Sequence, residues 1–226
     1  MFQGGGSPHP YFKKSEVILR AILICNGEPP PRNFLRKILK NYDFIACADG
    51  GANIAFNFKI EPNLIIGDLD SIKPKVKKFF AKKGIPIIYD PDQNSTDIEK
   101  ALKFLISQGF KQIDVTSAIG DRLDHNLGNL SALVNFHGKA KLRIIDKSME
   151  IFFVTDEISF EASPGDRISI LPLGEKAEGV STRGLKFKLD DDVLSFSGRG
   201  ISNIASGRRV LIKVEKGGLF VFRKTK

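Results

Sequence analysis

The sequence contains no tryptophan, only two cysteines, and no hydrophobic run that could cross a membrane. Cys25 and Cys47 are not part of a C-x-x-C pair, which argues against a zinc site and against a disulfide framework. The longest apolar run near the start, residues 17–25, is interrupted by Arg20 and lacks a small-residue cleavage site, whereas a membrane helix needs about 20 apolar residues. We therefore expect a cytoplasmic protein that does not bind a membrane.

Three signatures of common nucleotide enzymes are also missing. The chain has no G-x-x-x-x-G-K-[ST] motif, which excludes a P-loop enzyme, and no H-R-D or D-F-G motif, which excludes a protein kinase. No G-x-G-x-x-G follows the first apolar run, which argues against a dinucleotide-dependent oxidoreductase.

The composition is that of a globular protein: 42% of the 226 residues are hydrophobic and 27% are charged. The formal charge of +9 comes mostly from lysines spread along the chain, without an RNA-binding aromatic signature or a recognition-helix pattern. We interpret this charge as a solvated surface with a mild attraction for anionic ligands, and we expect no nucleic-acid partner.

Short β-type runs alternate with helical periodicity up to about residue 145, which predicts a mostly parallel, Rossmann-like α/β sheet with flanking helices. Thr96 and Glu99 form a capping box that begins one of these helices. The expected strands are residues 17–25, 44–48, 64–66, 85–89, 113–117 and 142–145. The expected helices are residues 32–40, 52–58, 74–83, 97–108 and 125–137.

After residue 151 the periodicity changes to short alternating runs separated by glycine, proline and aspartate turns. This pattern predicts a small antiparallel β-sandwich, with strands at residues 167–171, 186–189, 210–214 and 219–222. We expect three parts of the chain: a mobile leader at 1–15, an α/β nucleotide-binding domain at 16–147, and the β-sandwich domain at 148–226.

Polar clusters follow five of the expected strands, each at the carboxyl end. In open α/β sheets ligands bind at that edge, so residues distant in the sequence are expected to share one crevice. The clusters are Asn26-Gly27, Asp49-Gly50-Gly51, residues 68–71, residues 92–97 and residues 120–125.

The segment G-D-L-D-S at 67–71 carries two carboxylates. On an extended backbone Asp68 and Asp70 point to the same side, and their mutual repulsion would be relieved by a hard cation such as Mg²⁺. Two solvated aspartates in an ordinary turn are the alternative. Asp97 could supply a third carboxylate to the same cation, or it could merely stabilise the start of its helix.

The remaining clusters suggest contacts to phosphate. The backbone at Asp49-Gly50-Gly51 could approach a phosphate or ribose closely, although an ordinary turn explains it equally well. Arg122 could bind phosphate oxygens, while Asp124 could act as an N-cap. His125 could protonate a leaving group or simply pack at the helix start, and we favour the second. Together these residues fit the metal-assisted transfer of a phosphate group.

Four segments stand in the order and approximate spacing found in thiamine pyrophosphokinases, and the chain resembles that family from about residue 18 to its end. They are A-D-G-G-A-N (48–53), G-D-L-D-S (67–71), D-Q-N-S-T-D (92–97) and R-L-D-H (122–125). The resemblance implies an α/β nucleotide domain, a β-sandwich, and transfer of the pyrophosphoryl group of ATP to the hydroxyl of thiamine, giving thiamine diphosphate and AMP. It also implies a homodimer with thiamine at the subunit interface.

The resemblance also implies roles for individual residues. Asp68, Asp70 and Asp97 would hold Mg²⁺, and Arg122 would assist them in an in-line displacement for which we assign no general base. The nucleotide would contact Asn26, Asp49, Gly50, Gly51, Arg122 and Asp124. Thiamine would lie against Gln93 and Thr96, with Ser202 and Asn203 of the partner subunit closing the site.

Two features depart from the family pattern: Asp121 stands where a second glycine is usual, and no tryptophan is available to stack on thiamine. Two other functions therefore stay open. One is a related pyrophosphokinase acting on another alcohol, such as a pterin. The other is a non-catalytic sensor of nucleotide or thiamine.

Overall fold

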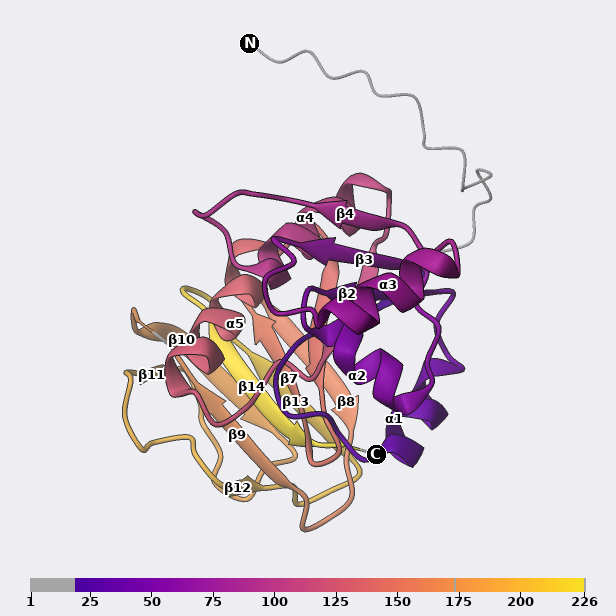
Figure 1. The fold of residues 1–226 in the computed structure, drawn as a ribbon. Coiled ribbons are helices and arrows are strands. Elements are labelled where there is room, and N and C mark those ends of the chain that lie inside the picture. Colours follow the sequence, from indigo (N-terminus) through magenta and orange to yellow (C-terminus); the bar gives the residue numbers. More distant parts are fainter. Residues whose placement is uncertain (1–18, 173, 226) are drawn as a thin grey trace. The chain divides into compact units, whose positions relative to one another are not determined.

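A computed structural model describes residues 19–172 and 174–225, so the predicted leader at 1–15 lies outside the described residues. The chain divides into two compact units (Figure 1). The α/β-unit comprises residues up to 132 together with 138–141, and the β-unit comprises 133–137 and 142 onward. The domain boundary expected between 147 and 148 stays a prediction.

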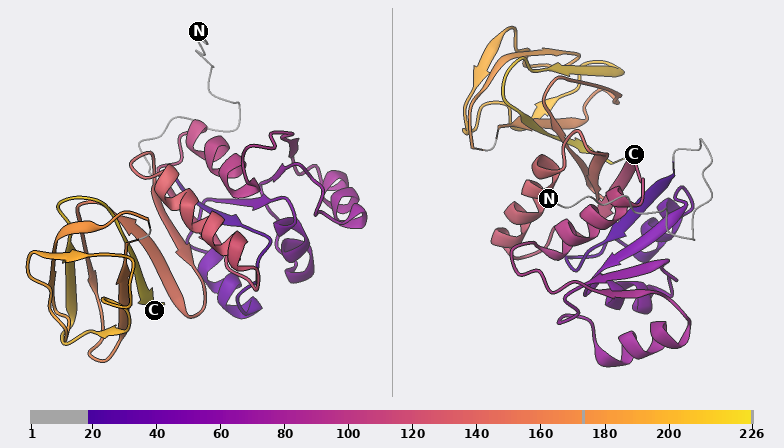
Figure 2. Two further views of the ribbon diagram at one scale, coloured as in Figure 1. Left: turned by 90° about the vertical axis from the view of Figure 1, so that its left-hand side faces the viewer. Right: turned by 90° about the horizontal axis from the view of Figure 1, so that it is seen from above.

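The α/β-unit has a parallel sheet in the order β5-β1-β2-β3-β4, with helices on both faces (Figure 2). This confirms the predicted Rossmann-like arrangement. Its strands are β1 (Arg20–Ile24), β2 (Phe44–Ala48), β3 (Leu64–Gly67), β4 (Ile87–Tyr89) and β5 (Gln112–Thr116). Its helices are α1 (Arg32–Leu39), α2 (Gly51–Phe58), α3 (Pro74–Lys82), α4 (Asp97–Ser107) and α5 (Leu123–Asn135), whose last residues belong to the β-unit.

Apolar side chains explain why α1, α2 and α3 share one face of this sheet. Leu35 of α1, Ala52 of α2 and Phe80 of α3 pack in one buried cluster with Ile24 and Cys47 of the strands. Helix α4 contacts β2 and β3 and begins with the predicted capping box of Thr96 and Glu99. Because strand ends and helix starts are fixed in this way, the connecting turns have a defined position at the carboxyl edge of the sheet.

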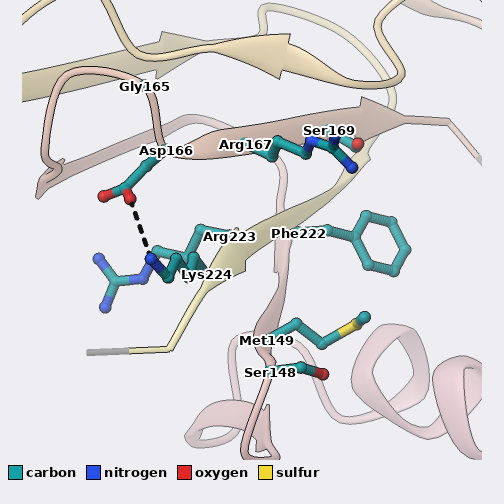
Figure 3. A pocket seen from close by; sticks show the side chains of 9 residues that line it. All are labelled: Ser148, Met149, Gly165, Asp166, Arg167, Ser169, Phe222, Arg223 and Lys224. Carbon is teal, nitrogen blue, oxygen red and sulfur yellow. Dashed lines mark ion pairs between the residues drawn. The ribbon is translucent and has the colours of Figure 1, made fainter.

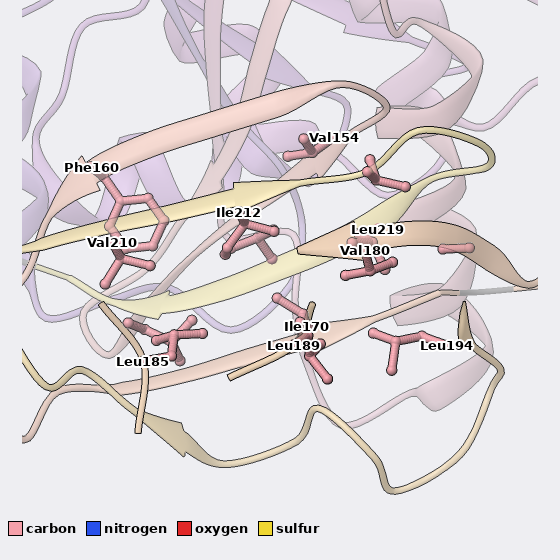
Figure 4. Close-up of a cluster of buried hydrophobic side chains, with 14 of the residues drawn as sticks. Val154, Phe160, Ile170, Val180, Leu185, Leu189, Leu194, Val210, Ile212 and Leu219 are labelled. Atoms are coloured by element: carbon pink, nitrogen blue, oxygen red, sulfur yellow. The ribbon is translucent and has the colours of Figure 1, made fainter. Parts of the chain in front are cut away.

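The β-unit consists of two antiparallel sheets, ordered β12-β9-β14-β7-β6 and β11-β10-β13-β8. Apolar residues from both sheets form its core (Figure 4), as expected of a β-sandwich. The strands are β6 (Lys141–Ile145), β7 (Met149–Val154), β8 (Glu157–Glu161), β9 (Arg167–Leu171), β10 (Ala177–Arg183), β11 (Asp192–Leu194), β12 (Asn203–Ile204), β13 (Arg209–Lys213) and β14 (Leu219–Lys224).

One predicted strand is wrong. Residues 186–189 alternate like a strand, but they form an irregular segment in the structure. The Leu189 backbone N–H donates to Thr182 Oγ1 (3.0 Å), and the Phe187 backbone is bonded to the side chain of Asn203. Side chains therefore take part of the backbone bonds that a neighbouring strand would have made, while the Lys186 N–H donates to the Ile204 carbonyl and the Leu189 carbonyl accepts from the Thr182 N–H. No helix within the described residues is long and apolar enough to cross a bilayer.

Candidate functional site

Three carboxylates from three separate turns meet at the carboxyl edge of the parallel sheet. Asp49 follows β2, Asp68 follows β3, and Asp97 is the first residue of α4. One oxygen of each lies within 4.8 Å of the other two. Such a set of oxygen donors suits a hard divalent cation.

Gly67 permits this close approach. A Cβ atom at position 67 would lie 2.8 Å from the Cβ of Asp49 and 3.0 Å from Oδ1 of Asp97. Both distances are shorter than ordinary van der Waals contact, so a larger residue would push the two acids apart. The last residue of β3 therefore helps to set the spacing of the carboxylates.

Asp70 lies outside this group of three. The extended backbone predicted for residues 68–70 is wrong, because Leu69 has a left-handed φ of +63° and the chain turns there. Asp70 is exposed. Its Oδ1 accepts a hydrogen bond from Ser71 Oγ (2.8 Å), while its backbone N–H points to Asp68 Oδ1 (3.4 Å). Asp70 as a metal ligand stays a prediction, and the structure places Asp49 beside Asp68 and Asp97 instead.

Asp49 is the most buried of the three acids, with 1% of its surface exposed. Its Oδ2 accepts a hydrogen bond from the Ser71 backbone N–H (2.9 Å), whereas its Oδ1 is buried without a partner. Burial raises the pKa of Asp49, and the hydrogen bond from Ser71 only partly offsets this effect. A buried carboxylate oxygen without a donor is unfavourable unless a ligand completes it.

Lys100 is the functional side chain that the sequence reasoning missed. It is 2% exposed, and its Nζ lies 3.0 Å from Asp68 Oδ2 and 3.2 Å from Asp97 Oδ1. Desolvation alone would raise the pKa of Asp68, but the hydrogen bond from Lys100 lowers it. Desolvation would likewise lower the pKa of Lys100, but its two carboxylate partners raise it. The only sequence signal was its spacing of one helical turn from Asp97.

Asn26, Gly50 and Gly51 lie together at the start of α2. A Cβ on Gly50 would meet the Asn26 side chain at 2.3 Å, and one on Gly51 would lie 2.0 Å from the carbonyl oxygen of Ile24. Glycine is thus required for packing of this turn against the end of β1. The first N–H groups of a helix are available to anions in such a place.

Arg122 and Asp124 pair with each other on an exposed surface. Arg122 Nη2 lies 2.6 Å and Nε 3.3 Å from the two carboxylate oxygens of Asp124. This contact raises the pKa of Arg122 and lowers the pKa of Asp124. Because α5 begins at Leu123, Asp124 lies inside its first turn, and the predicted N-cap role is wrong. Asp121 and His125 are exposed.

Two asparagines of α5 hold the preceding loop, which was not predicted. Asn126 accepts from the Gly120 backbone N–H and donates to the Gly120 carbonyl, both at 2.8 Å. Asn129 donates to the Ala118 carbonyl (2.6 Å). Ser117, at the start of this loop, has a φ of +54° and a buried hydroxyl without a partner. The turn after β5 is therefore held by side-chain hydrogen bonds, and the Ser117 hydroxyl within it lacks a hydrogen-bond partner.

Gln93 and Thr96, both predicted to lie against the acceptor, are exposed. The Gln93 side chain donates to the Pro91 carbonyl (3.3 Å). Thr96 accepts from the Glu99 backbone N–H (3.4 Å) in the capping box. Thr96 thus has a structural task regardless of any ligand.

Asn203 is not free to contact a ligand through its amide. Its Oδ1 accepts from the Phe187 backbone N–H (3.0 Å), and its Nδ2 donates to the Phe187 carbonyl (2.6 Å). Phe187 is held by these bonds, yet 60% of its surface is exposed. Neighbouring Ser202 has a φ of +58°, and its N–H donates to Ser169 Oγ (2.9 Å). The sequence reasoning missed Phe187, which the turn at Ser202-Asn203 presents to the surface.

The β-unit also carries a pocket of about 440 Å³ (Figure 3). Arg167 and Lys224 line it together with Phe222 and Met149, and Lys224 pairs with Asp166 at 3.8 Å. Basic side chains outnumber acidic ones in this lining, so its charge favours anions over cations.

Comparisons with known proteins agree on one family. A profile described as "Thiamin pyrophosphokinase, catalytic domain" matches residues 35–145, and one described as "Thiamin pyrophosphokinase, vitamin B1 binding domain" matches residues 155–219. Thiamine pyrophosphokinase 1 of Oryza sativa subsp. japonica is 28% identical over 234 residues, covering 91% of this chain and 88% of the rice protein. The crystal structure of thiamine pyrophosphokinase from Bacillus subtilis has a TM-score of 0.79 at 25% identity, covering 91% of this chain and 99% of that one.

Proposed function

The chain belongs to the thiamine pyrophosphokinase family, and we propose from this membership how its own residues divide the reaction. The protein transfers the pyrophosphoryl group of ATP to the hydroxyl of thiamine, giving thiamine diphosphate and AMP. The observation that carries the residue assignment is the convergence of Asp49, Asp68 and Asp97, with one buried oxygen of Asp49 left without a partner.

We assign these three carboxylates to a divalent cation, and we propose Mg²⁺. The unpartnered Asp49 Oδ1 fits this ion, because Mg²⁺ takes oxygen ligands and completes its shell with water and substrate phosphates. When bound, the ion would neutralise negative charge that develops on the pyrophosphoryl oxygens during in-line displacement. The chain's contribution is to fix the acids on two strand ends and one helix start, so that no rearrangement is needed at the moment of reaction.

We propose that the nucleotide binds across the turns after β1, β2 and β5. Asn26 and the N–H groups at Gly50 and Gly51 would bind phosphate or ribose oxygens. Arg122 is exposed and pairs only with exposed Asp124 among the contacts described above, so phosphate oxygens could replace that carboxylate at little cost. The loop held by Asn126 keeps Arg122 near this edge.

For thiamine we propose an aromatic contact at Phe187 in addition to the predicted Gln93, Thr96 and Ser202. The Phe187 ring is exposed while its backbone is held on both sides by Asn203. A ring fixed in this way can stack on a flat heterocycle and attract a positive charge such as that of the thiazolium. Asn203 would act by positioning Phe187. The anion-favouring pocket of Figure 3 is unsuited to a cationic vitamin.

We also propose that the protein works as a cytoplasmic homodimer in which the β-unit of one copy contributes to the thiamine site of its partner. Four large hydrophobic side chains of the β-unit are at least half exposed between residues 187 and 201: Phe187, Val193, Phe196 and Ile201. These four residues lie close together in the sequence, and exposed apolar side chains of this kind suit an interaction surface.

The first test is incubation of the purified protein with ATP, Mg²⁺ and thiamine, with products separated by chromatography. We expect one AMP for each thiamine diphosphate formed. AMP formed only with a pterin alcohol would establish the alternative acceptor. Tight binding without turnover would establish a sensor, and release of free pyrophosphate would show nucleotidyl transfer instead.

The second test addresses the thiamine contact. We expect Phe187→Ala to raise KM for thiamine about threefold to tenfold, since an aromatic contact contributes roughly 0.5–1.5 kcal/mol, while KM for ATP stays unchanged. Phe79→Ala is the control, because this ring of α3 is 41% exposed and lies outside the proposed thiamine and dimer contacts. Equal KM values for thiamine in the two variants would contradict the assignment of Phe187.

A further inference from the structure

Lys100 lies among carboxylates that the proposed function assigns to a cation, although it is itself a cation. Among the described residues it is the buried lysine. Its Nζ donates to one oxygen of each of two acids, Asp68 Oδ2 and Asp97 Oδ1. The third acid, Asp49, has one oxygen engaged by the Ser71 N–H. Each acid thus has at least one oxygen engaged, and the Oδ1 of Asp68 also accepts from the Asp70 backbone N–H (3.4 Å).

The position of Lys100 is fixed by its surroundings. Its stem lines a pocket of about 420 Å³ with Ile66, Ile88 and Phe104, and its backbone belongs to the helix that also carries Asp97. Leaving both carboxylates would cost the buried Lys100 ammonium two charge-assisted hydrogen bonds. We therefore treat Lys100 as a permanent member of the site.

The unpaired oxygen of Asp49 points to a further ligand. Three carboxylates and one ammonium have a formal charge of −2, which matches one divalent ion. Ca²⁺ takes six to eight oxygens and often binds a carboxylate through both of them, whereas Mg²⁺ accepts single oxygens in an octahedral shell. Because Lys100 holds one oxygen each of Asp68 and Asp97, bidentate binding of an ion by either acid would compete with these hydrogen bonds.

We infer that Lys100 is a specificity-determining residue that restricts the acidic site to one small octahedral divalent ion and excludes Ca²⁺. It acts by donating hydrogen bonds to Oδ2 of Asp68 and Oδ1 of Asp97 and by cancelling one of the three negative charges. This inference rests on the proposed cation site.

The experiment measures ion binding directly, without turnover. Mn²⁺ is titrated into the full-length protein and free Mn²⁺ is followed by electron paramagnetic resonance, with Mg²⁺ or Ca²⁺ added as competitor. We expect the wild type to bind one Mn²⁺ and to release it to Mg²⁺ far more readily than to Ca²⁺. In Lys100→Met we expect the ratio of Ca²⁺ to Mg²⁺ affinity to rise about tenfold, the lower end of the roughly 10–100-fold effect that loss of an outer-shell partner has on metal affinity.

Lys103→Met is the matched control, because Lys103 lies on the same helix and lines the same pocket but pairs with Asp92 and Ser95. Its ion preference should equal that of the wild type. An unchanged ratio in Lys100→Met overturns the inference while the proposed cation site stands. Absence of Mn²⁺ binding in the wild type overturns the site itself. If circular dichroism shows that Lys100→Met is unfolded, Lys100→Gln replaces it, and an unchanged ratio there is equally decisive.

Discussion

The two units differ in how completely their buried polar groups are paired. In the described chain, the buried side-chain atoms without a hydrogen-bond partner are Arg20 Nε, Asp49 Oδ1, Thr116 Oγ1 and Ser117 Oγ, and all of them belong to the α/β-unit. Asp49, Thr116 and Ser117 lie at or just after the carboxyl ends of strands. Three buried oxygens therefore lack hydrogen-bond partners at the edge of the sheet where a ligand is expected.

Buried polar groups of the β-unit are paired instead. Glu150 is 4% exposed and binds Arg223 through Oε2 and Arg143 through Oε1, and Arg223 lies over the rings of Phe152 and Phe160 at 5.1 and 4.7 Å. These groups determine the shape of the unit. The difference teaches that polar substitutions at the edge of the α/β-unit should cost activity, whereas those inside the β-unit should cost stability.

Backbone conformation follows a related pattern. Asp49, Leu69 and Ser117 have φ values of +37°, +63° and +54°, and each lies shortly after a strand of the α/β-unit. Such conformations cost on the order of 1–3 kcal/mol each for residues other than glycine. In the β-unit Ser202 has a φ of +58°, next to Asn203, which holds Phe187. Lys59 and Asp191 also have a φ of +54° away from these turns, so such strain accompanies the candidate ligand contacts without being confined to them.

The largest expected effect is that of Asp68→Asn on activity. Loss of one cation ligand should lower kcat about a thousandfold, since the bound ion supplies several kcal/mol of charge stabilisation. Thermal stability should change little, because Lys100 keeps Asp97 as a partner. AMP formation and thermal melting measure the two quantities. A large loss of stability with normal activity would break the comparison.

The second effect is on the stability of the β-unit. Glu150→Gln removes the buried carboxylate that pairs with both Arg223 and Arg143 and should lower the free energy of unfolding by about 3 kcal/mol. Urea denaturation followed by circular dichroism measures it. Glu157→Gln, an exposed position in β8, is the control, with an expected change within about 0.5 kcal/mol. Equal stability of the two variants would contradict the structural role of Glu150.

The smallest effect sharpens the comparison. In metal-free protein at neutral pH, Asp49→Asn should raise the melting temperature by about 2–4 °C, because the charged form of Asp49 is disfavoured by burial. The raised pKa means that the folded state takes up this proton more readily than the unfolded state. The melting temperature of the wild type should therefore approach that of the variant as the pH falls from neutral toward the pKa of Asp49. Melting curves with a chelator at neutral and mildly acidic pH measure this, and a variant that is less stable at neutral pH would refute it.

Features that depend on local sequence could be predicted. Strand β2 has the expected bounds, and the capping box of α4 follows from Thr96 and Glu99 alone. Features that depend on distant residues could not. The segment at 186–189 is irregular because Asn203 bonds the Phe187 backbone.

The candidate site shows the same limit. The sequence pattern indicated which turns carry the acids, because parallel strands end at one edge. It could not show that the chain turns at Leu69, which separates Asp70 from the group, or that Asp49 takes its place. Lys100 looks like any lysine of an amphipathic helix, and only the fold shows that it is buried against Asp68 and Asp97.

Gly67 has a practical consequence for anyone who wishes to redesign this enzyme for another ion. A methyl group there would lie 2.8 Å from the Cβ of Asp49, an atom that no rotamer change can move away, and 3.0 Å from Oδ1 of Asp97. The main chain of β3 therefore limits how the acid at position 49 can be placed. A library that varies residue 67 would have to allow the end of β3 to shift.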